Sequence, residues 1–245
     1  MTTAVIVPAR LGSTRFPRKM LHPVEGKPLI LWTAERIRQQ APDVPLHFAV
    51  AERALAEVVG EAGFSAVLTS ADHPNGTSRI AEANATIGAD RVVNIQADEP
   101  LVTGQQIRRL SELLAEPDTV MSTLGRPFSA ARDFMDPNQV KVVIGAGSRA
   151  LYFSRSPIPF NRDTGGFTPG ACFLHLGMYG YTGDFLQRYP TLSRGRLEEL
   201  EKLEQLRVLE HGYTIRIGIT EEPTLGVDTP ADADTLAQLL RGGLK

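Results

Sequence analysis

The sequence predicts an α/β fold, in which helices sandwich a mixed sheet, with a β-rich excursion in the second half of the chain. Two observations lead to this prediction. In the first half, short apolar runs alternate with longer segments whose apolar residues recur at helical spacing, the order of parallel strands joined by right-handed crossovers. Beyond Val120 this alternation stops, and strand-like segments follow one another with few helices between them.

The first half begins with an apolar run, residues 4–7, that is too short for a helix and ends at Pro8. The first helix is expected over 29–40, where apolar residues lie at helical spacing before Pro42. The same alternation continues through the next 70 or so residues. It predicts strands over 46–50, 66–69 and 91–95, and helices over 54–62, 77–87 and 105–114.

The second half is dominated by strand-like segments. Strands are expected over 140–144, 150–154, 172–181 and 214–219, and helices over 197–211 and 231–240. In the first of these helices, leucines 197, 200, 203 and 206 recur every three residues, which predicts a buried stripe. No linker rich in Gly, Ser or Pro divides the halves, so we expect one domain over 1–245, with an excursion at roughly 125–180 of a kind that often carries substrate contacts or a dimer interface.

Composition excludes several classes of protein. The formal net charge of −2 argues against general binding to nucleic acid or to an anionic membrane. No apolar run approaches 18 residues, and the N-terminus lacks the pattern of a secretory signal. The single cysteine, Cys172, has no partner for an intrachain disulfide, which favours a reducing compartment. We therefore expect a cytoplasmic protein.

Positive charge is concentrated in one loop, PARLGSTRFPRK, directly after the first strand. Arg10, Arg15, Arg18 and Lys19 lie there, although the loop matches neither of the standard glycine-rich nucleotide motifs. In open α/β sheets, ligands bind beyond the carboxyl ends of strands, and arginine and lysine suit phosphate oxygens. The loop therefore favours a polyphosphate site. A solvated loop that pairs with surface acids is the alternative.

Two aspartates follow apolar segments at positions suited to phosphate chemistry. Asp98 lies in VVNIQADEP, just past a predicted strand, and Asp228 lies in LGVDTPAD, before the last helix. Mg²⁺ in phosphoryl-transfer sites is held by one or two carboxylates together with substrate phosphates. Taken singly, Asp98 is equally consistent with an Asx turn and Asp228 with a helix cap.

These segments, with DHPNGTSR, ALYFSRSPIP, HLGMYGY and LEQLR, resemble the 3-deoxy-manno-octulosonate (Kdo) cytidylyltransferase family in order and spacing over nearly the whole chain. The resemblance implies a nucleotide-diphospho-sugar transferase-like (Rossmann-like) fold. It implies a Mg²⁺-dependent enzyme that joins CTP and Kdo into CMP-Kdo and pyrophosphate, for lipopolysaccharide biosynthesis. It also implies a homodimer.

The resemblance further implies site residues. Catalysis would use Lys19, Arg10, Asp98 and Asp228, with both aspartates as metal ligands. Nucleotide binding would use Arg10, Ser13, Arg15, Lys19, His73, Gly76, Thr77 and Arg79. Sugar binding would use Gln96, Arg155, Arg162, His175, Tyr179, Glu204 and Gln205. By strand alternation His175 and Tyr179 point to one face, yet either is also consistent with core packing.

The chain departs from the family pattern at several positions. Arg18 stands where members commonly have glycine, and Ala97 where they have the glycine of Q-G-D-E-P. These departures leave open another acidic acceptor, such as 8-amino-Kdo, a different ulosonic acid or a phosphonate. A catalytically silent nucleotide sensor is a further alternative, although both aspartates are present.

Overall fold

The structure is a computed structural model and describes residues 1–13 and 16–243. The chain divides into two compact units, and the division falls inside helix α4, Gly104–Leu113. Unit 1 comprises Met1–Ile107 and Glu222–Lys245, so its two segments are separated in sequence by all of unit 2, Arg108–Glu221. Within the described residues, no helix is both long and apolar enough to cross a membrane.

Unit 1 is built on a parallel sheet with the order β6-β1-β4-β5. Its central strand β1, Thr3–Ala9, pairs with β4, Leu46–Val50, on one side and with β6, Arg91–Asn94, on the other. The edge strand is β5, Ser65–Leu68. A small hairpin joins β2, Pro23–Val24, to β3, Lys27–Pro28. The parallel strands confirm the α/β interpretation of the first half.

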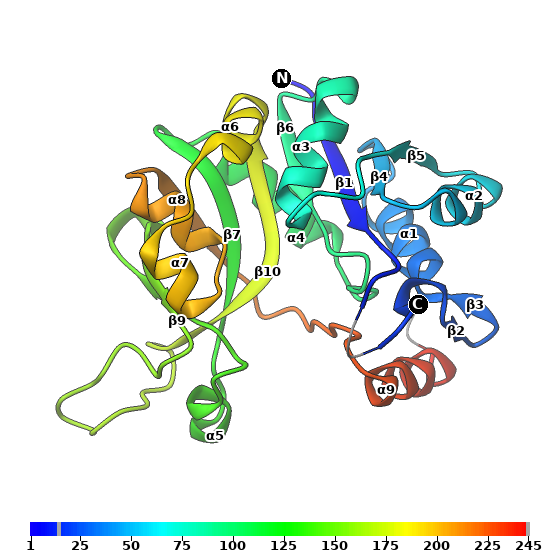
Figure 1. The fold of residues 1–245 in the computed structure, drawn as a ribbon. Helices are drawn as coiled ribbons and strands as arrows, with labels where there is room; N and C mark the ends of the chain where they lie inside the picture. Colours follow the sequence, from blue (N-terminus) through cyan, green and yellow to red (C-terminus); the bar gives the residue numbers. More distant parts are fainter. Residues whose placement is uncertain (14–15, 244–245) are drawn as a thin grey trace. The chain divides into compact units, whose positions relative to one another are not determined.

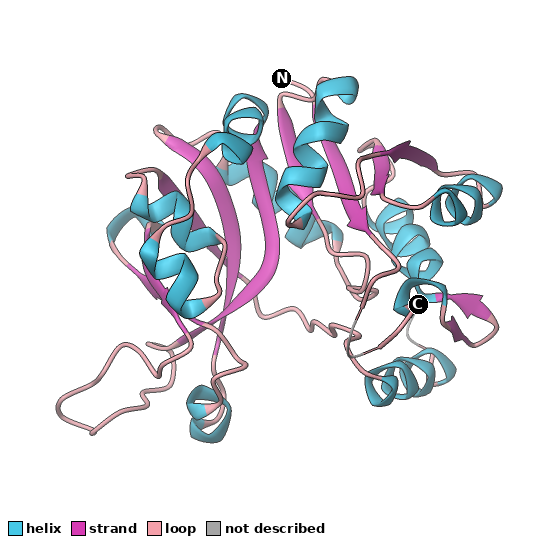
Figure 2. Cartoon of the chain, in the orientation of Figure 1, coloured by secondary structure: helices cyan, strands magenta, loops and turns pink. Residues whose placement is uncertain are grey.

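The helices of unit 1 connect these strands, as Figures 1 and 2 show. Helix α3 packs beside β1, and α2 beside β4 and β5. Helix α9 follows unit 2 in sequence and packs through Ala233 and Leu236 against Phe16, Leu29 and Val227. The helices are α1, Leu29–Gln40; α2, Arg53–Glu61; α3, Gly76–Ile87; and α9, Pro230–Arg241, with a short 3₁₀ helix at Lys19–Leu21.

Unit 2 contains a mixed sheet. Strand β7, Thr119–Pro127, pairs antiparallel with β10, Phe173–Thr182, and parallel with β11, Thr214–Ile219. Two shorter strands, β8, Lys141–Ile144, and β9, Ala150–Ser154, extend it from β10. A β-bulge interrupts the β10–β7 ladder between Leu176 and Tyr179.

The helices of unit 2 are short: α5, Ala131–Met135; α6, Gly183–Arg188; α7, Arg196–Glu201; and α8, Gln205–Glu210, with 3₁₀ turns at Ala146–Ser148 and Tyr189–Thr191. Residues 156–171, between β9 and β10, form a long loop without helix or strand, drawn in pink in Figure 2.

Two expectations for unit 2 are wrong, and one strand was not expected. The single helix over 197–211 is two helices, because Lys202 adopts a left-handed conformation (φ 54°) that ends α7. Its leucines therefore do not form one buried stripe: Leu203 and Leu206 are buried, but Leu200 is 69% exposed. Strand β7 was not expected, since its residues TVMSTLGRP form no continuous apolar run.

Candidate active site

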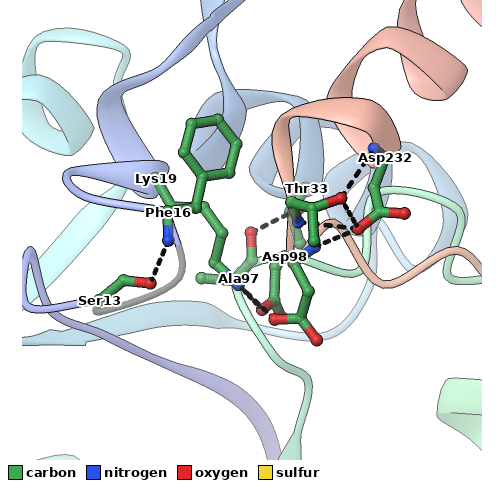
Figure 3. Close-up of polar contacts among 9 residues, drawn as sticks. Ser13, Phe16, Lys19, Thr33, Ala97, Asp98 and Asp232 are labelled. Carbon is green, nitrogen blue, oxygen red and sulfur yellow. Dashed lines mark hydrogen bonds and ion pairs between the residues drawn. The ribbon is translucent and has the colours of Figure 1, made fainter.

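Three charged side chains of unit 1 meet at one point. The Lys19 ammonium donates hydrogen bonds to Asp98 Oδ2 at 2.5 Å and to Asp228 Oδ1 at 2.9 Å. Figure 3 shows Lys19 and Asp98 pointing toward one another. The Lys19 side chain is only 8% exposed, whereas Asp98 and Asp228 are 23% and 46% exposed. The two carboxylates are therefore partly open to solvent, whereas the ammonium that they bind is buried.

Asp98 is held by the backbone that follows β6. The Glu99 amide donates to the Gln96 carbonyl, which closes a tight turn around Ala97 and Asp98. The Ala97 carbonyl accepts a hydrogen bond from the buried hydroxyl of Thr33 in α1 at 2.8 Å. Ala97 itself is buried, so its methyl group fits where the family pattern has glycine.

Asp228 is held from the opposite end of the chain. The Val227 amide donates to the Asp98 carbonyl at 3.0 Å, so the two aspartate loops share a backbone hydrogen bond. The cap of α9 is Thr229, which forms a capping box with Asp232. Asp232 also accepts from the Asp228 amide. The helix-cap interpretation of Asp228 is therefore wrong, and its carboxylate is left to bind Lys19.

The pKa values reflect this concentration of charge. Burial lowers the pKa of Lys19, but the ion pairs with Asp98 and Asp228 outweigh burial and raise it above its ordinary value. Lys19 is thus a permanent cation. The neighbouring Glu99 has its pKa raised to about 8 by burial and by the negative charges of Asp98 and Asp228. The negative charges of Asp98 and Asp228 thus keep Lys19 charged and oppose the ionisation of Glu99.

The donor set suits a hard divalent cation. Two carboxylates already converge on one cation here, and carboxylate oxygens are the ligands that Mg²⁺ prefers. Among the described residues, no cluster of three or more His, Cys, Asp or Glu side chains could hold a metal ion. Two carboxylates completed by phosphate oxygens match the usual Mg²⁺ site of phosphoryl transfer.

The cationic loop lies at the carboxyl end of β1. Arg10 is exposed just past the strand, and the Ser13 hydroxyl accepts from the Phe16 amide at 3.4 Å (Figure 3). Arg18 is exposed and left-handed, with φ 55°, a conformation that glycine adopts without strain. That geometry explains why glycine suits this position in the family pattern. Arg15, expected in the phosphate site, lies outside the described residues.

A second group of expected nucleotide residues surrounds the N-terminus of α3. A Cβ atom on Gly76 would lie 3.3 Å from Pro8, so glycine lets this helix start approach the end of β1. The His73 imidazole pairs with Glu82, and Thr77 is buried. Arg79 is only 3% exposed and donates to the Thr69 hydroxyl and the Ser70 carbonyl. In this structure Arg79 supports the loop that precedes α3.

In unit 2, three of the expected sugar residues form one cluster, in which His175 and Gln205 are buried. The rings of His175 and Tyr179 lie 5.5 Å apart, as their common face predicts. Gln205, at the start of α8, approaches His175 Nδ1 at 3.5 Å. Burial lowers the pKa of His175 to about 3, and burial together with the Glu204 charge raises that of Tyr179. Both side chains are therefore neutral.

The remaining expected sugar residues differ in how they are held. Arg155 donates to the carbonyls of Glu201 and Pro137, whereas Arg162 is exposed in the loop before β10. Glu204 is exposed beside the cluster, at the start of α8. Gln96 belongs to unit 1 and is half-buried after β6, where its amide approaches Asn94.

Three further residues of these sites were not expected from the sequence. Glu99 follows Asp98 directly, and its place in the same motif was the one available signal. Glu201 accepts hydrogen bonds from the Ser154 hydroxyl and the Arg155 amide, but it lies in an acidic run that looks like a solvated face. Thr123, in the strand that was missed, contacts His175.

Comparisons with known proteins identify the family of the chain. A cytidylyltransferase family model matches residues 4–217. The chain is 47% identical over 239 residues, 96% of its length and 95% of the relative's, to 3-deoxy-manno-octulosonate cytidylyltransferase from Syntrophobacter fumaroxidans. A solved structure of CMP:2-keto-3-deoxy-manno-octonic acid synthetase complexed with CTP superposes with a TM-score of 0.92 at 35% identity, covering all of both chains.

A more distant structure, a cytidylyltransferase from Leptospira borgpetersenii, shares the fold alone, with a TM-score of 0.67 at 17% identity over 100% of this chain and 89% of that one. The fold and the site thus define a nucleotidyltransferase of the cytidylyltransferase class. The chain belongs to the 3-deoxy-manno-octulosonate cytidylyltransferase (CMP-Kdo synthetase) family. The expected fold and enzyme class are confirmed, and members of this nucleotidyltransferase family are typically metal-dependent.

Proposed function

We propose that the protein transfers the CMP group of CTP to Kdo and releases pyrophosphate, as a step of lipopolysaccharide biosynthesis. The observation that carries this proposal is the meeting of Lys19, Asp98 and Asp228 beside the cationic loop after β1. A triphosphate needs several fixed cations, and phosphoryl transfer needs carboxylates able to hold a divalent metal. The 47% identical relative carries the name of this activity.

The reaction is an in-line displacement at the α-phosphorus. A hydroxyl oxygen of the sugar acid forms the new P–O bond, its proton leaves to solvent, and the bond to the bridging oxygen of pyrophosphate breaks. Arg10, Ser13, Arg15 and Lys19 are proposed to bind the triphosphate, and Lys19 and Arg10 to stabilise charge on the leaving pyrophosphate. Residues around α3, namely His73, Gly76, Thr77 and Arg79, are proposed to form the nucleoside site.

Asp98 and Asp228 are the proposed ligands of Mg²⁺, which when bound neutralises phosphate charge and makes a hydroxyl easier to ionise. Gln96, Arg155, Arg162, His175, Tyr179, Glu204 and Gln205 are the proposed sugar-acid residues. Neutral Tyr179 suits hydrogen bonding to a sugar hydroxyl, whereas an arginine suits the carboxylate. A homodimer and a cytoplasmic location remain predictions.

The test is pyrophosphate release with CTP, Mg²⁺ and a panel of acceptors: Kdo, 8-amino-Kdo, sialic acid and simple phosphonates. We expect release with Kdo that EDTA abolishes. Release with another acid alone would keep the chemistry and replace the acceptor, whereas CTP binding without release would favour a sensor.

Asp98→Asn tests the site directly. The variant should fold and lose about 10²–10³-fold in kcat, as when one electrostatic contact to the transition state is removed. Asp43→Asn, on the exposed surface of unit 1, is the matched control and should keep full activity. Normal turnover by Asp98→Asn would remove this aspartate from the mechanism.

A further inference from the structure

Thr123 forms an unusual set of contacts in the middle of β7. Its hydroxyl oxygen lies 2.7 Å from the Met178 carbonyl, 3.0 Å from the Leu176 carbonyl and 3.0 Å from His175 Nε2. Both carbonyls lie where a bulge interrupts the β10–β7 ladder, between Leu176 and Tyr179. Thr123 is fully buried, so the hydroxyl satisfies carbonyl groups that water does not reach.

These contacts determine where the protons lie. A threonine hydroxyl has one proton and two lone pairs, and a carbonyl oxygen only accepts. If Thr123 donated its proton to His175, its oxygen would face two carbonyl oxygens at 2.7 and 3.0 Å with no hydrogen between them. The hydroxyl therefore donates to the carbonyls and accepts from His175, whose Nε2 must carry a hydrogen.

The other ring nitrogen of His175 is then bare. Burial keeps the imidazole neutral, since its pKa lies near 3. With the hydrogen on Nε2, Nδ1 offers only a lone pair and must accept from its neighbour. That neighbour is the side-chain amide of Gln205, 3.5 Å away, and only the NH₂ end of an amide donates. The tautomer of His175 thus selects the orientation of the Gln205 amide.

We propose that Thr123 is a positioning residue which, through the Nε2–H tautomer of His175, turns the Gln205 carboxamide so that its carbonyl oxygen is offered to a hydroxyl of the sugar acid. The inference rests on the proposed function, in which Gln205 contacts the sugar. In the described part of the chain, Gln205 forms one hydrogen bond with the protein, through Nε2, so Oε1 is left for a ligand. The site then prefers a hydroxyl donor over an acceptor at that position.

The tautomer is measured directly on the wild-type protein by ¹⁵N NMR, because protonated and bare imidazole nitrogens differ strongly in chemical shift. The signals of His175 are assigned by their loss in His175→Gln. We expect a bare Nδ1 and a protonated Nε2 at neutral pH. A protonated Nδ1 would overturn the proposal, and this measurement does not depend on enzyme activity.

The variants Thr123→Val and Thr123→Ser test the consequence for the substrate. Valine has the shape of threonine but no acceptor, so the Nε2–H tautomer loses its advantage and KM for Kdo should rise about tenfold, the value of one hydrogen bond. KM for CTP should stay within twofold, and serine should restore KM for Kdo. An unchanged KM for Kdo in Thr123→Val would overturn the positioning role.

The proposed function can fail separately. If the tautomer is as expected but Kdo is not a substrate, the hydrogen-bond chain stands and its assignment to a sugar hydroxyl is overturned. If Kdo is a substrate but His175 has a protonated Nδ1, the function stands and the positioning role of Thr123 is overturned.

Discussion

Lys19 binds the two carboxylates that are proposed to hold a divalent cation. Its ammonium contacts Asp98 and Asp228 at 2.5 and 2.9 Å, and its own burial leaves it few other partners. An ammonium and a metal ion compete for one pair of ligands, so Lys19 has to yield them when a metal ion binds. A triphosphate gives the displaced ammonium a new counter-ion.

Lys19→Met should therefore bind Mn²⁺ without nucleotide more tightly than the wild type, by about tenfold for 1.4 kcal/mol of relieved competition. The measurement is titration of Mn²⁺ followed by electron paramagnetic resonance, which needs no turnover. Lys27→Met, which removes an ion pair with Glu35 elsewhere in unit 1, is the control. Equal Mn²⁺ affinity in Lys19→Met and the wild type would contradict the competition.

His175 should make the free energy of unfolding decrease as the pH falls. Its pKa is about 3 in the folded protein, below its ordinary value of 6.5, so folding favours the neutral imidazole. The resulting stability is fully present above pH 6.5 and is lost as pH falls toward 3, with a slope of at most about 1.4 kcal/mol per pH unit. Denaturant unfolding at several pH values should show a shallower decline for His175→Gln over this window. Identical slopes in the two proteins would show that His175 titrates normally.

At the scale of elements, the break between α7 and α8 is spanned by a buried ion pair. Arg207 in α8 donates through Nε and Nη2 to both carboxylate oxygens of Glu198 in α7, at 2.7 and 2.6 Å, and both side chains are less than 10% exposed. The guanidinium also lies over the Tyr189 ring, 4.8 Å from its centre. This pair fixes the helix that starts with Gln205.

Arg207→Met should lower the free energy of unfolding by about 3 kcal/mol or more, because it leaves the Glu198 carboxylate buried without its partner. The double variant Glu198→Leu/Arg207→Met should recover most of that loss, since it removes both charges. Denaturant unfolding measures both. The exposed pair of Arg241 and Glu25 provides a control, and Arg241→Met should change little. A double variant as unstable as Arg207→Met would show that packing, and not charge, causes the loss.

The strands that were predicted from the sequence differ in composition from the strand that was missed. Strands β1, β4 and β6 were predicted because buried parallel strands are continuous apolar runs. Strand β7 was missed because its small and polar residues are used for contacts that sequence does not show: the Ser122 hydroxyl donates to the Leu110 carbonyl, and Gly125 lies against Ile217. The break at Lys202 was missed because lysine is a good helix former, and the local pattern continues through it.

Some features of the candidate site could be expected from the sequence, and others could not. That Asp98 and Asp228 lie near the loop after β1 could be expected, because loops at the carboxyl ends of parallel strands share one edge; their roles stay predictions. Their shared ion pair with Lys19 could not, since it depends on how α9 returns to unit 1. Likewise, nothing in DHPNGTSR indicates that Arg79 is buried beneath its own loop.

At the scale of the whole molecule, the proposed ligand sites are divided between the two units. Lys19, Asp98 and Asp228 lie in unit 1, whereas His175, Tyr179 and Gln205 lie in unit 2. Each unit has its own strands and its own buried hydrophobic residues. Binding of each ligand should therefore slow amide hydrogen exchange mainly in the unit that carries its proposed site.

Hydrogen exchange followed by mass spectrometry measures this slowing in each segment of the chain. CTP with Mg²⁺ should slow exchange in the loops after β1 and β6 and in residues 226–229, because these amides surround the proposed phosphate site. Kdo should slow exchange in β10 and at the start of α8. An unrelated sugar such as glucose is the control ligand and should change neither. Slowing by CTP confined to unit 2 would contradict the assignment of the nucleotide to unit 1.

Because the ribosome makes the chain from its N-terminus, Asp98 and Asp228 are synthesised at different times. Lys19 and Asp228 are 209 residues apart, and all of unit 2 is translated between the two segments of unit 1. While unit 2 is being made, the nascent chain already carries Lys19 and Asp98. It lacks Asp228 until the segment after unit 2 has been made. Chains whose synthesis stops before residue 228 therefore lack one of the two carboxylates that are proposed to hold the metal ion.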